Sequence, residues 1–178
     1  MAGFEEIFEQ QRSMALLLRA ERYGQRRKRL LKLERWILAH RKDIHYALSK
    51  DLLKSKQETD LAEIYAVLTE IREARKNLKS WMEPQYILPT FTFLGTTGYH
   101  LYEPKGVCLI ISPWNYPFNL AVGPLVSAIA AGNTFILKPS EFTPETSSLI
   151  KRMVTEVLEE SMGFVVEGDA RMSQNLLK

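Results

Sequence analysis

The 178-residue chain has one cysteine, Cys108, which excludes an internal disulfide and a cysteine-rich metal site. Its three histidines lack the spacing of metal ligands: His40, His45 and His100. We therefore expect no bound metal. So little cysteine is typical of a protein in a reducing compartment, and we expect a cytoplasmic protein.

Charge and hydropathy exclude two classes of partner. The 24 basic and 21 acidic residues leave a net charge of only +3, which is too small to indicate a nucleic-acid-binding surface. The first residues are acidic where a secretory leader would be basic, and the longest apolar stretch, 118–131, is too short to span a membrane. We expect a folded protein that binds no nucleic acid and has no membrane segment.

Proline is absent before Pro84, and the residues up to Glu83 favour helices. We expect two or three amphipathic helices, whose apolar faces carry Leu30, Leu33, Ile37 and Leu38 in one group and Ile64, Val67, Leu68, Ile71, Leu78 and Trp81 in the other. The basic run 26–29 has the composition of a nuclear-targeting or RNA-binding patch, but its place in an amphipathic helix favours a solvated helix face. Residues 85–105 contain more proline and glycine, which indicates an extended segment.

From Gly106 onward, strand-like and helix-like segments alternate. The unbroken apolar run 107–111 predicts a strand buried on both faces. The next segment, 118–131, predicts a buried helix broken at Pro124 and closed by Gly132 and Asn133.

A second strand is expected at 134–137, and a third at 164–166. Between them Thr143 and Pro144 predict the capped start of a helix that runs to about Glu160. The resulting βαβαβ order predicts an α/β fold: amino-terminal helices and the first half of a doubly wound parallel sheet.

Ligands of such sheets bind at the carboxyl ends of the strands, which here are 112–117 and 138–141. Neither loop contains the G-x-G-x-x-G fingerprint, so a dinucleotide would not be held in the usual glycine turn. The loops carry instead the amide Asn115 and two opposite charges, Lys138 and Glu141, groups that suit an oxyanion and sugar hydroxyls. The alternatives are a turn asparagine and a solvated ion pair.

Several segments resemble the aldehyde dehydrogenase superfamily, and most of all its class 3, fatty-aldehyde branch. The main matches are Glu103-Pro104-Lys105-Gly106, 111–117, 130–133 and 138–141. The likeness also covers 76–81, 165–169 and the stretch Asp51-Leu52-Leu53-Lys54, and so nearly the whole chain.

The resemblance implies an NAD(P)-dependent oxidation of an aldehyde to a carboxylic acid through a cysteine thiohemiacetal. It implies that Asn115 donates its amide to the oxyanion and that Lys138 and Glu141 bind the adenosine ribose. Cofactor contacts are further implied for Ile111, Ser112, Pro113, Trp114 and Ser140. The extended segment would be an oligomerisation arm, which implies a homo-oligomer, either a dimer or a tetramer.

The resemblance implies that the family's nucleophilic cysteine, general-base glutamate and second glycine-containing cofactor loop lie beyond the end of this sequence. Cys108 lies in an apolar strand and is expected to be an inert packed thiol. We expect an amino-terminal fragment, inactive alone, that consists of helices (1–84), arm (85–105) and the first part of the cofactor-binding domain (106–178). The alternative is a non-catalytic nucleotide-binding or assembly module with the same fold.

Overall fold

A computed structural model describes residues 2–177, with side chains from residue 4 onward. The amino-terminal part is helical, as predicted, but it contains more helices than expected because short turns without proline interrupt it. The helices are α1 (Ala2–Arg19), α2 (Tyr23–Ala39), α3 (Arg41–Leu52), the single turn α4 (Lys56–Glu58), the π-helix η1 (Thr59–Ile64) and α5 (Tyr65–Met82).

The apolar faces of α2 and α5 are buried as predicted, except for one side chain at the margin of each. Leu38 is 51% exposed and Trp81 is 47% exposed, so both expectations were wrong. The solvated face expected for the run 26–29 is also wrong for Arg26. Its buried guanidinium donates hydrogen bonds to the carbonyls of Leu18, Ala130 and Ala131, at the carboxyl ends of two other helices.

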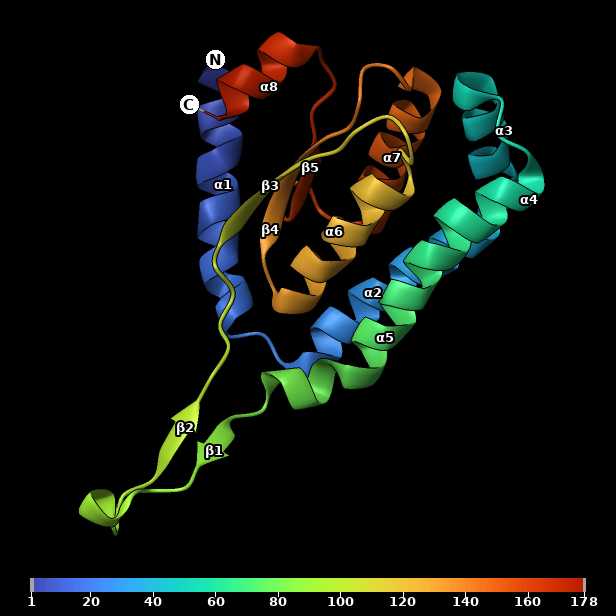
Figure 1. The fold of residues 1–178 in the computed structure, drawn as a ribbon. Helices are drawn as coiled ribbons and strands as arrows, with labels where there is room; N and C mark the ends of the chain where they lie inside the picture. Colours follow the sequence, from blue (N-terminus) through green and yellow to red (C-terminus); the bar gives the residue numbers. More distant parts are fainter. Residues whose placement is uncertain (1, 178) are drawn as a thin grey trace.

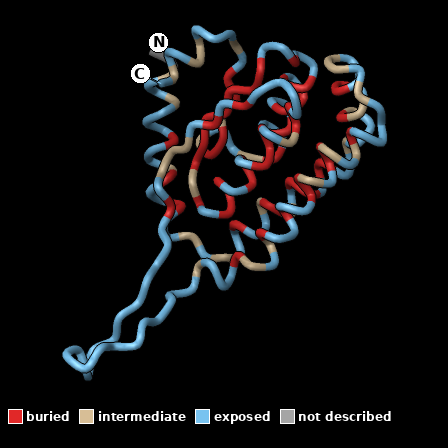
Figure 2. Tube along the Cα trace, viewed as in Figure 1, coloured by how far each residue is buried: buried red, intermediate tan, exposed pale blue. Residues whose placement is uncertain are grey.

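The extended segment forms a hairpin that stands away from the rest of the molecule (Figure 1). Strand β1 (Gln85–Ile87) pairs antiparallel with β2 (Gly98–His100), and the 3₁₀ turn η2 (Phe91–Phe93) forms the tip. All three elements are exposed along their length (Figure 2).

A three-stranded parallel sheet is the centre of the fold. Its strands are β3 (Val107–Ile111), β4 (Thr134–Lys138) and β5 (Gly163–Val165), in the order β3-β4-β5. Helix α6 (Asn119–Ala131) connects the first two strands, α7 (Pro144–Val157) connects the last two, and α8 (Ala170–Leu176) follows. The predicted βαβαβ unit is confirmed. Within residues 2–177 the strand order runs in one direction, without the reversal that would complete a doubly wound sheet.

The elements form layers (Figure 1). Helix α1 contacts β3 and β4 on one face of the sheet, while α6 and α7 pack on the other. Helices α2, α3 and α5 form an outer layer over α6 and α7. The core lies between these layers (Figure 2), and its largest fully buried side chains include Leu30, Ile37, Ile71, Phe118, Leu125, Phe135, Leu137 and Ile150.

Three local expectations were wrong. Strand β3 is not buried on both faces: Leu109 and Ile111, which point to the same face, are 38% and 42% exposed, because the described residues leave that face of this edge strand incompletely covered. Pro124 lies inside α6 without breaking it, on an exposed position where the unpaired carbonyl of Leu120 can meet water. Helix α7 ends at Val157, before Glu160.

Candidate active site at the carboxyl edge of the sheet

The exits of β3 and β4 meet at the carboxyl edge of the sheet. Ile111 and Lys138 are the last residues of these strands and are register partners. The Ser112 amide then donates to the Lys138 carbonyl at 3.1 Å, which extends the pairing by one residue. The structure therefore brings together Ile111, Ser112 and Lys138.

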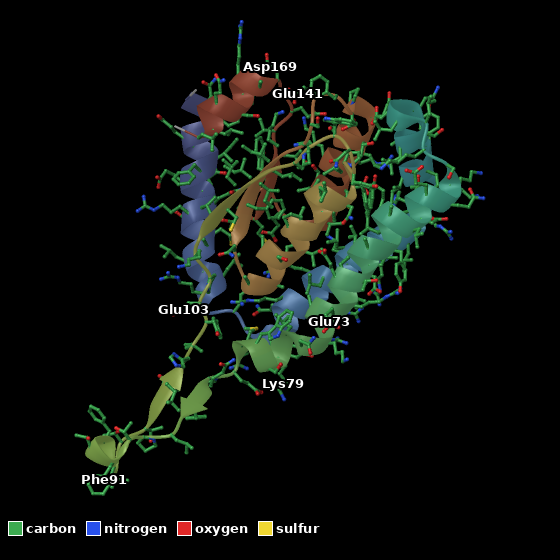
Figure 3. The ribbon with its side chains drawn as sticks, in the orientation of Figure 1. Glu73, Lys79, Phe91, Glu103, Glu141 and Asp169 are labelled. Atoms are coloured by element: carbon green, nitrogen blue, oxygen red, sulfur yellow. The ribbon has the colours of Figure 1, made fainter. Side chains whose placement is uncertain are left out.

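Lys138 joins Glu141 to this edge. The Lys138 side chain is only 3% exposed, and its Nζ donates a hydrogen bond to Oε2 of Glu141, whose side chain is 31% exposed. This hydrogen bond holds the pKa of the Glu141 carboxyl below its ordinary value, against the opposing charge of Asp169. Figure 3 shows Glu141 and Asp169 at the same end of the molecule. The carboxylate form of Glu141 is therefore favoured, and only the glutamate end of the pair is partly open to solvent.

The two serines of the site differ. Ser112 is buried, and its Oγ has no hydrogen-bond partner among the described residues. Ser140 Oγ accepts from the Phe142 amide at 3.2 Å, and the Ser140 carbonyl accepts from Ser147 Oγ at 2.8 Å. Ser140 thus builds the turn that carries Glu141, whereas Ser112 has an unused polar group.

This donor set fits the ribose of a nucleotide. An ammonium supplies donors and a carboxylate supplies acceptors, which is what sugar hydroxyls require. The orphaned Ser112 hydroxyl adds a buried polar atom at the same strand exit. Such an atom is expected to acquire a partner when a ligand binds.

Asn115 lies beyond this cluster on the exposed loop after β3. Pro113 and Trp114 are exposed before it, Trp114 by 53%. The Asn115 side chain is exposed and forms no hydrogen bond with any residue in the range 4–177. Its carbonyl accepts a hydrogen bond from Lys54 Nζ at 2.9 Å. This hydrogen bond comes from the turn between α3 and α4, and among the described residues no hydrogen bond joins Asn115 to Lys138 or Glu141.

The sequence alone predicts no role for two carboxylates, Asp51 and Glu63, that accept hydrogen bonds at the starts of α7 and α6. Asp51, on α3, accepts hydrogen bonds from the amides of Glu145 and Thr146 at 3.2 and 2.8 Å, and so caps α7. Thr143 occupies the N-cap position as predicted, but its side chain does not cap the helix. Glu63 caps α6 in a similar way, through the Asn119 amide. The matching stretch from Asp51 to Lys54 was the only signal in the sequence.

Cys108 lies on β3, away from these loops, and is partly buried. Burial raises the pKa of its thiol, which disfavours the thiolate. No group of three His, Cys, Asp or Glu side chains among the described residues could hold a metal ion. No helix within residues 2–177 is both long enough and apolar enough to cross a membrane.

Comparison with known proteins shows the family of the chain. The aldehyde dehydrogenase family model matches residues 4–178. The chain belongs to the aldehyde dehydrogenase family. It is 38% identical over 153 residues to mouse aldehyde dehydrogenase family 3 member B3, covering 86% of this chain and 32% of that one. It is 41% identical over 152 residues to the 4,4'-diaponeurosporen-aldehyde dehydrogenase of Staphylococcus aureus, covering 85% and 33%.

A solved structure, substrate-bound AldH of Staphylococcus aureus, superposes with a TM-score of 0.94 at 37% identity, covering 98% of this chain and 38% of that chain. The similarity to the class 3 branch is thus confirmed, and so is the fold. The chain spans about a third of the length of the two curated relatives.

Proposed function

We propose that the protein takes part in the oxidation of an aldehyde to a carboxylic acid, with NAD or NADP as the hydride acceptor. The proposal rests on the carboxyl ends of β3 and β4, which are neighbours in the sheet. The Lys138–Glu141 pair follows β4, and the loop after β3 carries Asn115, whose side-chain amide forms no hydrogen bond with a described residue. Membership of the aldehyde dehydrogenase family supports it.

The cofactor would lie along the carboxyl edge of the sheet. Lys138 would donate to hydroxyls of the adenosine ribose, and Glu141 would accept from them. Ile111, Ser112, Pro113 and Trp114 would line its path, and Ser140 would hold the turn that carries Glu141. When bound, the nicotinamide cofactor would accept the hydride. The side chains named above would bind and orient the cofactor.

Asn115 would stabilise negative charge on the aldehyde oxygen. Its amide is free to donate because no described residue accepts from it, and its backbone is held by Lys54. A donor that is positioned before charge develops lowers the barrier without reorganising. The whole protein's substrate would therefore be a carbonyl compound that reaches this loop.

The β1–β2 hairpin would be an oligomerisation arm. Its exposed apolar side chains include Leu88, Phe91 and Leu94, with exposures of 91%, 89% and 66%. Apolar surface of this kind marks a protein contact. We propose that residues 85–105 mediate a homo-oligomer, while 1–84 and 106–178 together hold the cofactor.

Formation of reduced nicotinamide from a panel of aldehydes, followed by absorbance, tests the proposal. The protein as its gene encodes it should oxidise at least one aldehyde, and lack of turnover with every aldehyde and both cofactors would refute the proposal and favour a non-catalytic module. Residues 1–178 alone should produce none, because the thiol of Cys108 is disfavoured as a nucleophile. Turnover by residues 1–178 that disappears in Cys108→Ala would contradict that assignment.

A further inference from the structure

Lys54 makes three contacts, and two of them are to the loop after β3. Its side chain is 8% exposed, and its Nζ donates to Glu63 Oε1 at 2.6 Å and to the Asn115 carbonyl at 2.9 Å. The same nitrogen lies 4.1 Å from the centre of the Tyr116 ring, within range of a cation–π interaction. Two of the three contacts are thus to consecutive residues of the loop.

Glu63 links Lys54 to the first residue of α6. Its side chain is fully buried, and its second oxygen, Oε2, accepts from the Asn119 amide at 2.8 Å. Asn119 Nδ2 in turn donates to the Ala62 carbonyl at 3.1 Å. The first amides of a helix have no partner within the helix, so an external carboxylate there fixes where α6 begins.

Unusual backbone presents both side chains. Lys54 follows Leu53, which ends α3 in the left-handed region at φ 54° although its side chain is 89% exposed. Glu63 lies in the π-helix η1, and π turns often occur at functional sites. The left-handed Leu53 is the C-cap of α3, and its amide donates to the Ser49 carbonyl at 3.1 Å. The Lys54 amide donates to the Leu48 carbonyl at 3.4 Å, so the turn that carries Lys54 is fixed locally.

We propose that Lys54 and Glu63 are positioning residues that hold the Asn115 peptide, and thereby its amide, at one place relative to the aldehyde. This inference rests on the proposed oxyanion role of Asn115. A buried ion pair adds little net stability compared with apolar side chains, whereas its directed hydrogen bonds fix geometry. The loop is thereby fixed at three points: Ser112 on β4, Asn115 on Lys54, and Asn119 on Glu63.

The test uses Lys54→Met in the protein as its gene encodes it, with Lys50→Met as the matched control. Lys50 lies on α3 with its Nζ 5.5 Å from the centre of the Tyr46 ring, but it is exposed and contacts no part of the loop. Lys54→Met should lower kcat by up to about 10²-fold, the usual effect of a misplaced catalytic group, and leave the cofactor KM unchanged. Lys50→Met should change neither, and Lys54→Arg should restore part of kcat.

Hydrogen–deuterium exchange provides a readout independent of activity. Lys54→Met should speed the exchange of amides in peptides that cover 115–120 and leave those of β4 unchanged. Because Lys54→Met leaves Glu63 buried without its partner, it could fail to fold. The variant Lys54→Met/Glu63→Gln removes both charges, and it should still speed the exchange and lower kcat because the Asn115 carbonyl still lacks its donor.

A double-mutant cycle separates positioning from general damage. If Lys54 acts through Asn115, adding Lys54→Met to Asn115→Ala should lower kcat no further than Asn115→Ala alone. Equal losses in both backgrounds, or unchanged exchange at 115–120, would overturn the positioning role. If Asn115→Ala leaves kcat intact, the proposed oxyanion role fails instead, while faster exchange in Lys54→Met would still show that the pair holds the loop.

Discussion

Asp60 accepts hydrogen bonds from two basic side chains at once. Arg41 donates from Nε at 2.7 Å and from Nη2 at 2.5 Å, and His45 Nε2 lies 2.7 Å from Asp60 Oδ1. The hydrogen bond from Arg41, opposed by partial burial and assisted by His45, lowers the pKa of Asp60 to about 2. This cluster ties α3, which ends just before Lys54, to η1, which carries its partner Glu63.

A pH-dependent stability follows from that pKa. The folded value lies below the ordinary 3.8, so the contribution is complete above that pH and is lost as pH falls through about 2. Asp60→Asn should lower the free energy of unfolding by about 1 kcal/mol at neutral pH, because the pair is partly exposed. Urea unfolding of both proteins in a series of acidic buffers should show the difference shrinking. A difference independent of pH would contradict this.

At this scale, the sequence could indicate residues within contiguous motifs but not residues joined by long-range contacts. Asn115 and Glu141 stand in the loops that the strand pattern indicates, and Lys138 ends the strand before one of them, so all three could be proposed in advance. Lys54 contacts Asn115 across 61 residues, and Arg26 reaches the end of α6 across 104. A single sequence shows which lysines and arginines exist, but it does not show which of them the fold buries.

At the scale of elements, the end of α6 depends on a glycine and on the arginine packed against it. Gly132 adopts φ 84°, in the left-handed region, as the C-cap. A Cβ at this position would collide with the guanidinium of Arg26, which is held by carbonyls of α1 and α6. Both observations require glycine here.

Gly132→Ala should therefore lower the free energy of unfolding by about 2 to 4 kcal/mol, the sum of left-handed strain and overpacking. Gly24→Ala is the matched control, because Gly24 lies in α2 and a Cβ there would meet open space. It should be neutral or stabilising by up to about 1 kcal/mol. Thermal unfolding would measure the stability of both variants. If Gly132→Ala were as stable as Gly24→Ala, the Arg26 side chain would have moved aside without cost, and the prediction would be wrong.

Element types were more predictable than their surroundings. The glycine cap after residue 131 follows from local chemistry, and the structure confirms it. The unbroken helix at Pro124, the exposed side of β3 and the π-helix at 59–64 depend on neighbouring layers or on a shift in hydrogen-bond register. The local preferences of the residues do not predict these three features.

At the scale of the whole molecule, the β1–β2 hairpin is the part that does not pack against the core. Phe91, labelled in Figure 3, lies at its tip, far from the core. The sequence predicted the extended segment from its prolines and glycines. The layering of α2, α3 and α5 over α6 and α7 was not predictable, because amphipathic faces show that helices pack without showing on what.

Replacement of Leu88, Phe91 and Leu94 with serine should convert the proposed oligomer into a smaller species that is still folded. These side chains contribute little to the core, because each is at least 66% exposed. Analytical ultracentrifugation would report the mass. Leu17→Ser, at a 67% exposed position on α1, is the control and should leave the mass unchanged. An unchanged mass in the triple variant would refute the arm.

We propose that Asn115 and Lys138 serve different steps at one edge of the sheet. Steady-state kinetics of Asn115→Ala and Lys138→Ala, in the protein as its gene encodes it, test this most directly. Asn115→Ala should lower kcat by about 10² to 10³ and leave the cofactor KM unchanged, because the amide acts only as charge develops. Lys138→Ala should mainly raise the cofactor KM, because a ribose contact is made equally before and during hydride transfer. An Asn115→Ala variant that changed only the cofactor KM would contradict the account.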